Sequence, residues 1–212
     1  MIALVLAGGE LSPDSRLRRL AREAGLIVAA DSGLAHAPGL GVTPDLIIGD
    51  FDSVSAADLE RFPDVPRMRH PADKGQLDLE LAAEAALWQG ATRLRLMGLI
   101  GGRCDQSLAG LLIAARLHRD EVPTTAHTSV ADIHFLSGEE TLVLDAPPGT
   151  VFSLLSLSNE ARVSVSGARY PLSSFTLPFG VGQGVSNVTE PGVEIRLTTG
   201  LLSTIVERKK GG

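Results

Sequence analysis

The chain has 212 residues and a formal net charge of −6, which fits one large domain or two small ones. It has no long basic run, so binding of nucleic acid through a positive patch is excluded. Its single cysteine, Cys104, excludes an internal disulfide. No apolar run approaches the roughly 20 residues that cross a bilayer, and the first apolar run is too short for a secretory signal. We therefore expect a cytoplasmic protein with no membrane partner.

Strands and helices alternate along the first two-thirds of the chain. Short apolar runs that end at glycine or aspartate indicate buried strands, and apolar residues at helical spacing indicate helices. The expected strands are 2–7, 26–30, 45–48, 65–69 and 93–97, and the expected helices are 13–24, 78–89 and 106–117. This order predicts an α/β domain, a mostly parallel sheet flanked by helices.

The pattern changes near residue 130. Short β-branched segments bounded by turns follow at 141–144, 151–157, 161–165, 194–199 and 201–206. They predict a C-terminal antiparallel β-sandwich domain. We expect an α/β domain over 1–128 and the β-sandwich over 129–212.

Four of the expected strand exits carry glycine or polar residues. They are Gly8-Gly9, the segment 31–33, the segment 49–53 and the segment 98–105. In a parallel sheet all four exits face one edge, where open α/β sheets bind their ligands. The sequence therefore predicts a ligand site at that edge.

Asp50 and Asp52 leave one strand a single residue apart. At about 4 Å, two such carboxylates repel by roughly 1–4 kcal/mol, depending on the local dielectric. A divalent cation removes this repulsion, and Mg²⁺ typically bridges one or two carboxylates and a substrate's phosphates. In the alternative interpretation both are turn residues, and Ser53 or Ser55 caps the helix that follows, with Ser55 and Asp58 spaced as in a capping box.

Three further segments carry polar groups that a ligand can use. The Gly101-Gly102-Arg103 segment precedes a helix and suits a phosphate, although Asp105 can instead be a plain N-cap. Asp78 opens the long helix and has the same alternative. Ser186 and Asn187 offer hydrogen-bonding groups to a heteroaromatic ring, or form an ordinary hairpin turn.

In this order, the segments resemble those of the thiamine pyrophosphokinase family over nearly the whole chain. The resemblance rests on segments 30–33, 44–53, 74–80, 101–105 and 184–187. It implies an N-terminal domain that binds Mg²⁺ and ATP and a C-terminal domain that binds thiamine. It also implies transfer of a diphosphoryl group from ATP to the thiamine hydroxyl with release of AMP, and a homodimer with active sites at the subunit interface.

The resemblance assigns roles to individual residues by position. The catalytic acids are Asp50, Asp52, Asp78 and Asp105, of which the first three are the metal ligands. The residues on the nucleotide side are Asp31, Ser53, Gly101, Gly102 and Arg103. Those on the thiamine side are Ser186 and Asn187. Which carboxylate accepts the proton of the hydroxyl, Asp78 or Asp105, stays open.

The chain departs from the family at three positions. Gly75 and Leu77 replace an acid and a threonine, and Gln106 replaces a histidine. These changes leave room for a different hydroxymethyl heterocycle as acceptor, or for a binding protein without activity. An Asp-x-Asp pair also occurs in sugar-nucleotide transferases, which release a nucleoside diphosphate rather than AMP.

Overall fold

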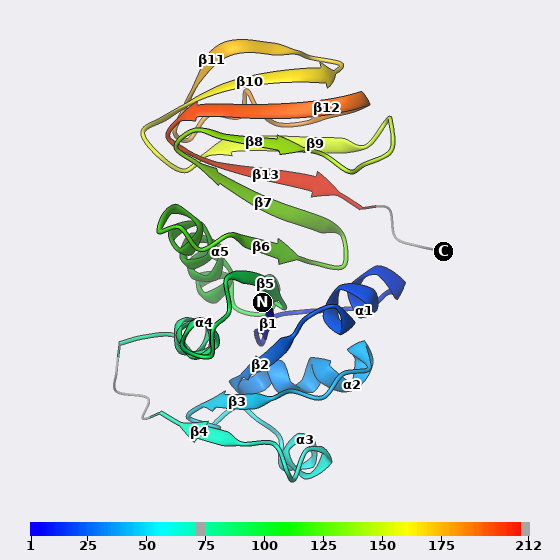
Figure 1. The fold of residues 1–212 in the computed structure, drawn as a ribbon, viewed down its shortest axis with the longest axis vertical. Coiled ribbons are helices and arrows are strands. Elements are labelled where there is room, and N and C mark those ends of the chain that lie inside the picture. Colours follow the sequence, from blue (N-terminus) through cyan, green and yellow to red (C-terminus); the bar gives the residue numbers. More distant parts are fainter. Residues whose placement is uncertain (71–74, 209–212) are drawn as a thin grey trace. The chain divides into compact units, whose positions relative to one another are not determined.

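The computed structural model describes residues 1–70 and 75–208 (Figure 1). Lys74, part of one motif of the resemblance, lies outside the described residues. The chain forms two compact units. The first comprises Met1–Ala114 and Val122–Ser129, and the second comprises Ala115–Glu121 and residues 130–208.

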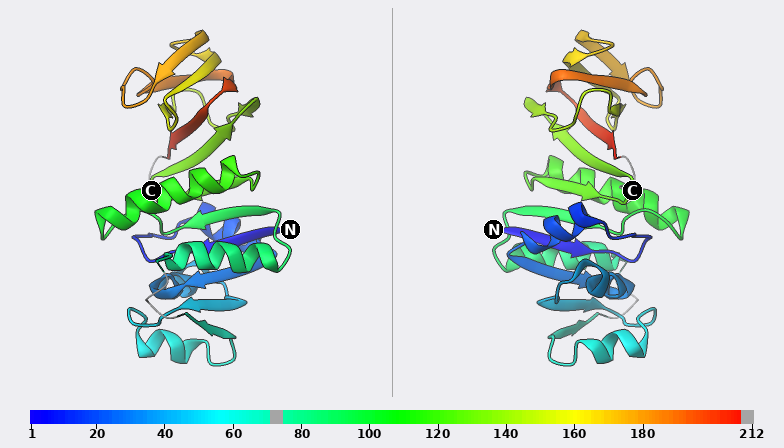
Figure 2. Two further views of the ribbon diagram at one scale, coloured as in Figure 1. Left: turned by 90° about the vertical axis from the view of Figure 1, so that its left-hand side faces the viewer. Right: turned by 90° about the vertical axis from the view of Figure 1, so that its right-hand side faces the viewer.

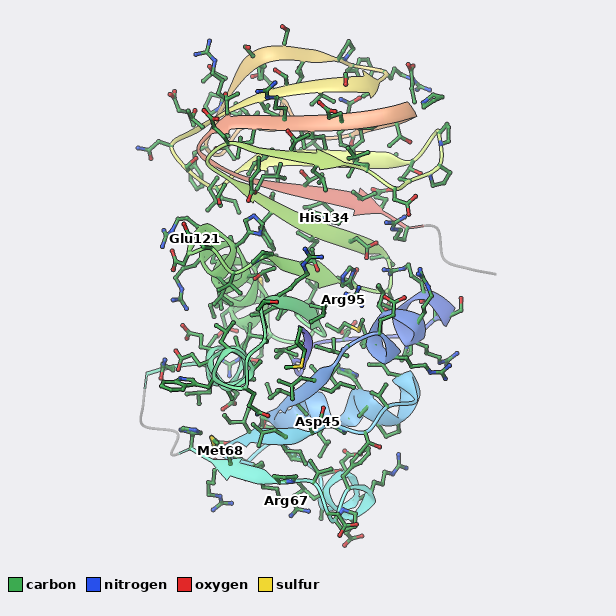
Figure 3. The ribbon with its side chains drawn as sticks, viewed as in Figure 1. Asp45, Arg67, Met68, Arg95, Glu121 and His134 are labelled. Atoms are coloured by element: carbon green, nitrogen blue, oxygen red, sulfur yellow. The ribbon has the colours of Figure 1, made fainter. Side chains whose placement is uncertain are left out.

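The first unit contains a parallel sheet. Its strands are β1 (Ile2–Leu6), β2 (Leu26–Ala30), β3 (Leu46–Gly49), β4 (Arg67–Arg69), β5 (Arg93–Met97) and β6 (Thr124–His127). They lie in the order β6-β5-β1-β2-β3-β4, each pair parallel. Asp45 holds the start of β3 against β2, because its Oδ2 accepts the Ile27 N–H at 2.8 Å (Figure 3). The predicted parallel sheet is confirmed.

Helices cover both faces of this sheet (Figures 1 and 2). They are α1 (Ser15–Arg22), the 3₁₀ helix η1 (Asp31–His36), α2 (Ala37–Leu40), α3 (Ala56–Arg61), α4 (Asp78–Trp88) and α5 (Cys104–Arg119). Leu4 and Leu6 of β1 pack against Leu17 of α1 and Leu40 of α2. Helix α4 lies along β1, β2 and β3 on the other side. Alternation along the strand explains both contacts, because successive side chains of β1 point to opposite faces.

Strand β4 forms the edge of the sheet, and all three of its residues are exposed (Figure 3). The preceding helix, α3, begins after Ser55, whose Oγ accepts the Asp58 N–H at 3.1 Å. The proposed cap at Ser55 is therefore confirmed. Helices η1 and α2 have no counterpart among the expected helices, because each is too short to show a helical period. Helix α3 was indicated only by its cap.

The second unit is antiparallel. Its strands are β7 (Ala131–Ser137), β8 (Glu140–Val143), β9 (Val151–Ser156), β10 (Glu160–Ala168), β11 (Leu172–Pro178), β12 (Asn187–Thr199) and β13 (Leu201–Glu207). One sheet contains β7, β13 and β9, and the other contains β8, β12, β10 and β11. Strand β12 links them, because Asn187 and Val188 pair with β9.

Alternate side chains of both sheets meet in one apolar core. Phe152 and Leu154 of β9 pack there with Val163, Ile195 and Leu202. The predicted β-sandwich is confirmed, although β7 and β11 were not among the expected strands. Within the described residues, no helix is both long enough and apolar enough to span a membrane.

Candidate active site

A cavity of about 390 Å³ opens at the carboxyl ends of β1, β2, β3 and β5. Seven of the residues that the sequence assigned to the site line it: Asp31, Asp50, Asp52, Ser53, Asp78, Gly101 and Arg103. Gly102 and Asp105 do not line it. A larger, shallow depression of about 650 Å³ beside α3 is lined by none of the predicted residues.

The sheet order explains why these distant residues meet. Strands β5, β1, β2 and β3 are neighbours in that order, so their exit loops emerge side by side. The loops also pack closely. Gly98 has φ +73°, and a β-carbon there would overlap the carbonyl oxygen of Ala7. Only glycine allows this approach between the loops after β1 and β5.

Asp31 is the most buried acid of the cavity, with 7% of its surface exposed. Burial raises the pKa of its carboxyl, and the charge of Asp50 raises it further, against the N–H groups of Ser32 and Phe51 and the hydroxyl of Ser53. Its Oδ1 has no hydrogen-bond partner among the described residues. A buried carboxylate with an unpaired oxygen is costly, so this site favours a proton or a cation.

The Asp50-Phe51-Asp52 turn is held by its own side chains. Asp50 Oδ1 accepts the Asp52 N–H at 2.9 Å, a bond that aspartate often makes in turns. Phe51 adopts φ +65°, and the Arg69 guanidinium lies 5.6 Å from the centre of its ring. Asp50 therefore acts as a turn residue, as the alternative interpretation held, and also lines the cavity.

Asp78 is the first residue of α4, and Leu77 is the N-cap. The alternative that Asp78 caps this helix is therefore wrong. Leucine has no acceptor for the free N–H groups of the first turn, although Glu80 Oε2 accepts the Leu77 N–H at 3.1 Å. Burial raises the pKa of Asp78 to about 6, helped by the charges of Asp31 and Asp50.

Arg103 and Asp105 form an ion pair. The Nη2–Oδ2 distance is 2.6 Å, and Arg103 Nε donates to Oδ1 at 3.1 Å. These bonds raise the pKa of Arg103 and lower that of Asp105. Asp105 lies within the first turn of α5, which begins at Cys104, so the alternative that it is the N-cap is also wrong.

Backbone strain is concentrated at predicted site residues. In the part of the chain that the structure describes, five residues other than glycine have positive φ: Asp31, Phe51, Glu121, Ser174 and Ser186. Asp31 and Ser186 were assigned to the site, and Phe51 lies between two assigned acids. Such conformations cost about 1–3 kcal/mol and tend to persist at functional sites. Ser186 and Asn187 lie in the second unit.

The acids suit a hard cation that also binds the substrate. Among the described residues, no three Asp, Glu, His or Cys side chains are close enough to enclose a metal. Mg²⁺ rarely needs such a cage, because it keeps several waters and uses one or two carboxylates with substrate phosphates. Asp31, Asp50 and Asp78 repel one another electrostatically, and such an ion would relieve this repulsion.

An acidic, glycine-lined cavity at the carboxyl edge of a parallel sheet defines an α/β protein that binds its ligand where the strands end. A family model described as the catalytic domain of thiamin pyrophosphokinase matches residues 17–126. A second, described as its vitamin B1 binding domain, matches residues 139–202. The chain belongs to the thiamin pyrophosphokinase family.

Individual relatives agree with the family models. A thiamine pyrophosphokinase of Bacillus subtilis is 25% identical over 188 residues, which cover 86% of this chain and 87% of that protein. The thiamin pyrophosphokinase from Geobacillus thermodenitrificans is 29% identical to this chain in sequence. Its crystal structure superposes with a TM-score of 0.81, and the match covers 100% of this chain and 99% of that chain. The Bacillus subtilis structure, at 23% identity, shares the fold with a TM-score of 0.86 and covers 99% of this chain and 100% of its own.

Proposed function

We propose that this chain is an active thiamine pyrophosphokinase. It transfers a diphosphoryl group from ATP, bound with Mg²⁺, to the hydroxyl of thiamine, and it releases thiamine diphosphate and AMP. The observation that carries the proposal is the cavity that gathers Asp31, Asp50, Asp52 and Asp78 with Arg103, within the region that the catalytic family model matches. Residues 1–128 would bind the nucleotide and metal, and residues 129–212 would bind thiamine.

Asp50 and Asp52 are the proposed principal ligands of Mg²⁺. When bound, the ion would offset their charge and that of the phosphates. The resemblance adds Asp78 as a third ligand. A bound cation lowers the pKa of a carboxyl, so metal binding at Asp78 competes with a role as proton acceptor. The Mg²⁺ affinity of Asp78→Asn, measured by calorimetry without ATP, separates the two roles.

Arg103 and the amides of Gly101 and Gly102 are the proposed phosphate contacts, and Asp31 and Ser53 complete the nucleotide side. Phosphoryl transfer requires positioning and charge neutralisation more than covalent help, which suits a guanidinium and backbone N–H groups. The Gly101 N–H donates to Ser107 Oγ at 3.2 Å, so a phosphate would take the place of that hydroxyl. The ion pair with Asp105 uses Nε and Nη2 of Arg103 and leaves other N–H groups for a phosphate.

Asp78 is the proposed proton acceptor for the thiamine hydroxyl. It lines the cavity, and its pKa of about 6 lies near neutral pH, where a general base is most effective. Asp105 is exposed, lies outside the cavity lining and has a lowered pKa. Its proposed part in catalysis is to hold Arg103 rather than to accept a proton.

We place Ser186 and Asn187 on the thiamine side, because the vitamin B1 binding model covers them. From the family resemblance we also propose a homodimer with active sites at the subunit interface. Multi-angle light scattering tests the dimer. It should give twice the chain mass of 22.2 kDa, and a single chain mass would contradict it.

The decisive experiment incubates the protein with MgATP and thiamine and identifies the products by mass spectrometry. We expect thiamine diphosphate and AMP in equal amounts. Formation of ADP would contradict diphosphoryl transfer. Binding of both substrates without AMP would indicate a protein that has the fold without the activity.

A second acceptor is favoured by one observation. Leu77 lines the cavity where the family has threonine, so an apolar group replaces a hydroxyl in the wall. A site that hydrogen-bonds a group of its substrate discriminates strongly in favour of that substrate. Loss of the protein's hydrogen-bonding group relaxes this discrimination. A competition assay between thiamine and other hydroxymethyl heterocycles, read as AMP formed from each, tests this alternative.

A further inference from the structure

The carboxamide of Asn187 takes the place of a strand partner. Strands β10 and β12 pair up to Ala168 and Thr189, and the Arg169 N–H then donates to the Val188 carbonyl at 2.9 Å. Beyond this point the partner of the Tyr170 backbone is a side chain. Asn187 Oδ1 accepts the Tyr170 N–H at 3.1 Å, and Asn187 Nδ2 donates to the Tyr170 carbonyl at 2.8 Å.

These contacts occupy most of the hydrogen-bonding capacity of Asn187. Oδ1 also accepts the Val188 N–H at 2.8 Å, so both of its lone pairs are used. The residue is 7% exposed. A substrate could reach its acceptor oxygen only by displacing a backbone N–H.

The neighbouring turn is fixed on its other side by β9. The Ser186 N–H donates to Ser153 Oγ at 3.1 Å, and the Leu154 N–H donates to the Gly184 carbonyl at 2.8 Å. A β-carbon at Gly184 would overlap the carbonyl oxygen of Leu154. Ser186 is exposed at φ +65°, and its hydroxyl has no hydrogen bond within the described part of the chain.

We propose that Asn187 is a positioning residue of the thiamine site and that Ser186 is the residue that contacts the acceptor. Asn187 acts through the Tyr170 backbone, which it joins to the turn that presents the Ser186 hydroxyl. This inference rests on the proposed function. The family resemblance assigned contact with thiamine to both Ser186 and Asn187, whereas the proposal gives the contact to Ser186 and the positioning to Asn187.

The test compares Asn187→Ala with Asn187→Asp, which keeps an acceptor for the Tyr170 N–H and loses the donor. Amide hydrogen exchange of Tyr170 is measured without thiamine, because exchange reports local opening. The KM values for thiamine and ATP and the kcat are measured on the same proteins. In Asn187→Ala we expect Tyr170 exchange and the thiamine KM to rise about tenfold or more, with the ATP KM and kcat within about twofold. In Asn187→Asp both effects should be partly restored.

Thr189→Val is the matched control. Thr189 lies two residues further along β12, is 2% exposed, and uses Oγ1 to bond the Pro147 carbonyl at 2.7 Å and the Thr150 N–H at 2.9 Å. This variant should lose stability while its thiamine KM stays within about twofold, because its hydrogen bonds do not reach Tyr170.

Two outcomes would overturn the proposal. A raised thiamine KM with unchanged Tyr170 exchange would mean that Asn187 contacts the acceptor directly. Faster Tyr170 exchange with an unchanged thiamine KM would mean a purely structural role. If Asn187→Ala does not fold, Asn187→Asp decides by the same two readouts. If the wild-type protein forms no thiamine diphosphate, the proposed function fails, and thiamine affinity by calorimetry replaces the KM in testing Asn187.

Discussion

Gly49 and Asp31 lie so close that a β-carbon at Gly49 would be 3.0 Å from the β-carbon of Asp31. Gly49 ends β3 and Asp31 directly follows β2, and these strands are neighbours, since Ala30 pairs with Ile48 in the sheet. Gly49 has φ +152°, a conformation that side chains rarely adopt. The close contact and the backbone conformation together require glycine at position 49. The position of the Asp31 carboxylate therefore depends on the absence of a β-carbon at Gly49.

Gly49→Ala should therefore lower the free energy of unfolding by about 1–3 kcal/mol and displace Asp31. Thermal denaturation and AMP formation measure the two effects. Gly138→Ala is the control, because Gly138 also has positive φ (+63°) but nothing within 4 Å of an added β-carbon. We expect it to lose about 1 kcal/mol and to retain activity. Equal effects of the two variants would contradict the role of the contact.

Asp52→Asn should lower kcat about 100-fold or more, because the variant removes a charge that the proposed ion and phosphates require. Asp52 is exposed, so circular dichroism and the melting temperature should stay unchanged. Asp64→Asn, a change of another exposed acid in the first unit, should leave kcat unchanged. Near-normal turnover of Asp52→Asn would remove Asp52 from the metal site.

Leu77→Thr should stabilise α4. A threonine at the N-cap can accept the Glu80 N–H while Glu80 continues to accept the N–H of residue 77, which completes a capping box. Leu77→Val has the same shape without the hydroxyl, and the threonine variant should exceed it by about 0.5–1.5 kcal/mol in unfolding free energy. Activity with thiamine should be unchanged or higher. A large loss of activity would indicate that Leu77 serves a different acceptor.

Asp78 should make the stability of the metal-free protein depend on pH. Its pKa is raised from 3.8 in the reference state to about 6 in the folded state, so the folded chain binds this proton more tightly. The resulting stabilisation is complete below about pH 4 and is lost as the pH rises through about 6. Between about pH 7.5 and pH 5 the wild type should gain about 1–2 kcal/mol relative to Asp78→Asn, after allowance for solvent screening. Urea denaturation of both proteins at each pH measures this difference, and parallel profiles would show that the pKa is not raised.

Asp78→Asn and Asp105→Asn should affect catalysis unequally. Loss of the proposed proton acceptor should lower kcat about 100-fold or more, within the range that general-base catalysis supplies. Loss of Asp105 frees Arg103 and should change kcat less than about tenfold, with the larger effect on the ATP KM. Steady-state kinetics at saturating thiamine tests the order. The reverse order would identify Asp105 as the acceptor.

The parts of the site that follow from strand ends could be predicted from the sequence. Asp50, Asp52 and Asp31 follow apolar runs, and a parallel sheet places such exits together. The limits of α4 were predicted to within one residue, although its leucine N-cap carries no signal. Those of α5 were not, because the helix begins at Cys104 and the residue before it, Arg103, is not a typical N-cap. The proposed role of Asn187 depends on a contact with Tyr170, 17 residues earlier, which no local pattern reveals.

The short edge of the first sheet has a consequence for solubility. Open strand edges can recruit other chains into a growing sheet, and natural proteins limit this by keeping edge strands short and charged. Strand β4 has three exposed residues, and Met68 is flanked by Arg67 and Arg69. The same strand pairs with β3, whose exit carries Asp50. The loop that carries Asp50 is thus flanked on its outer side by a strand too short and too positively charged to pair readily with a strand of another molecule. At high protein concentration, the entrance of the cavity should therefore stay free of other chains.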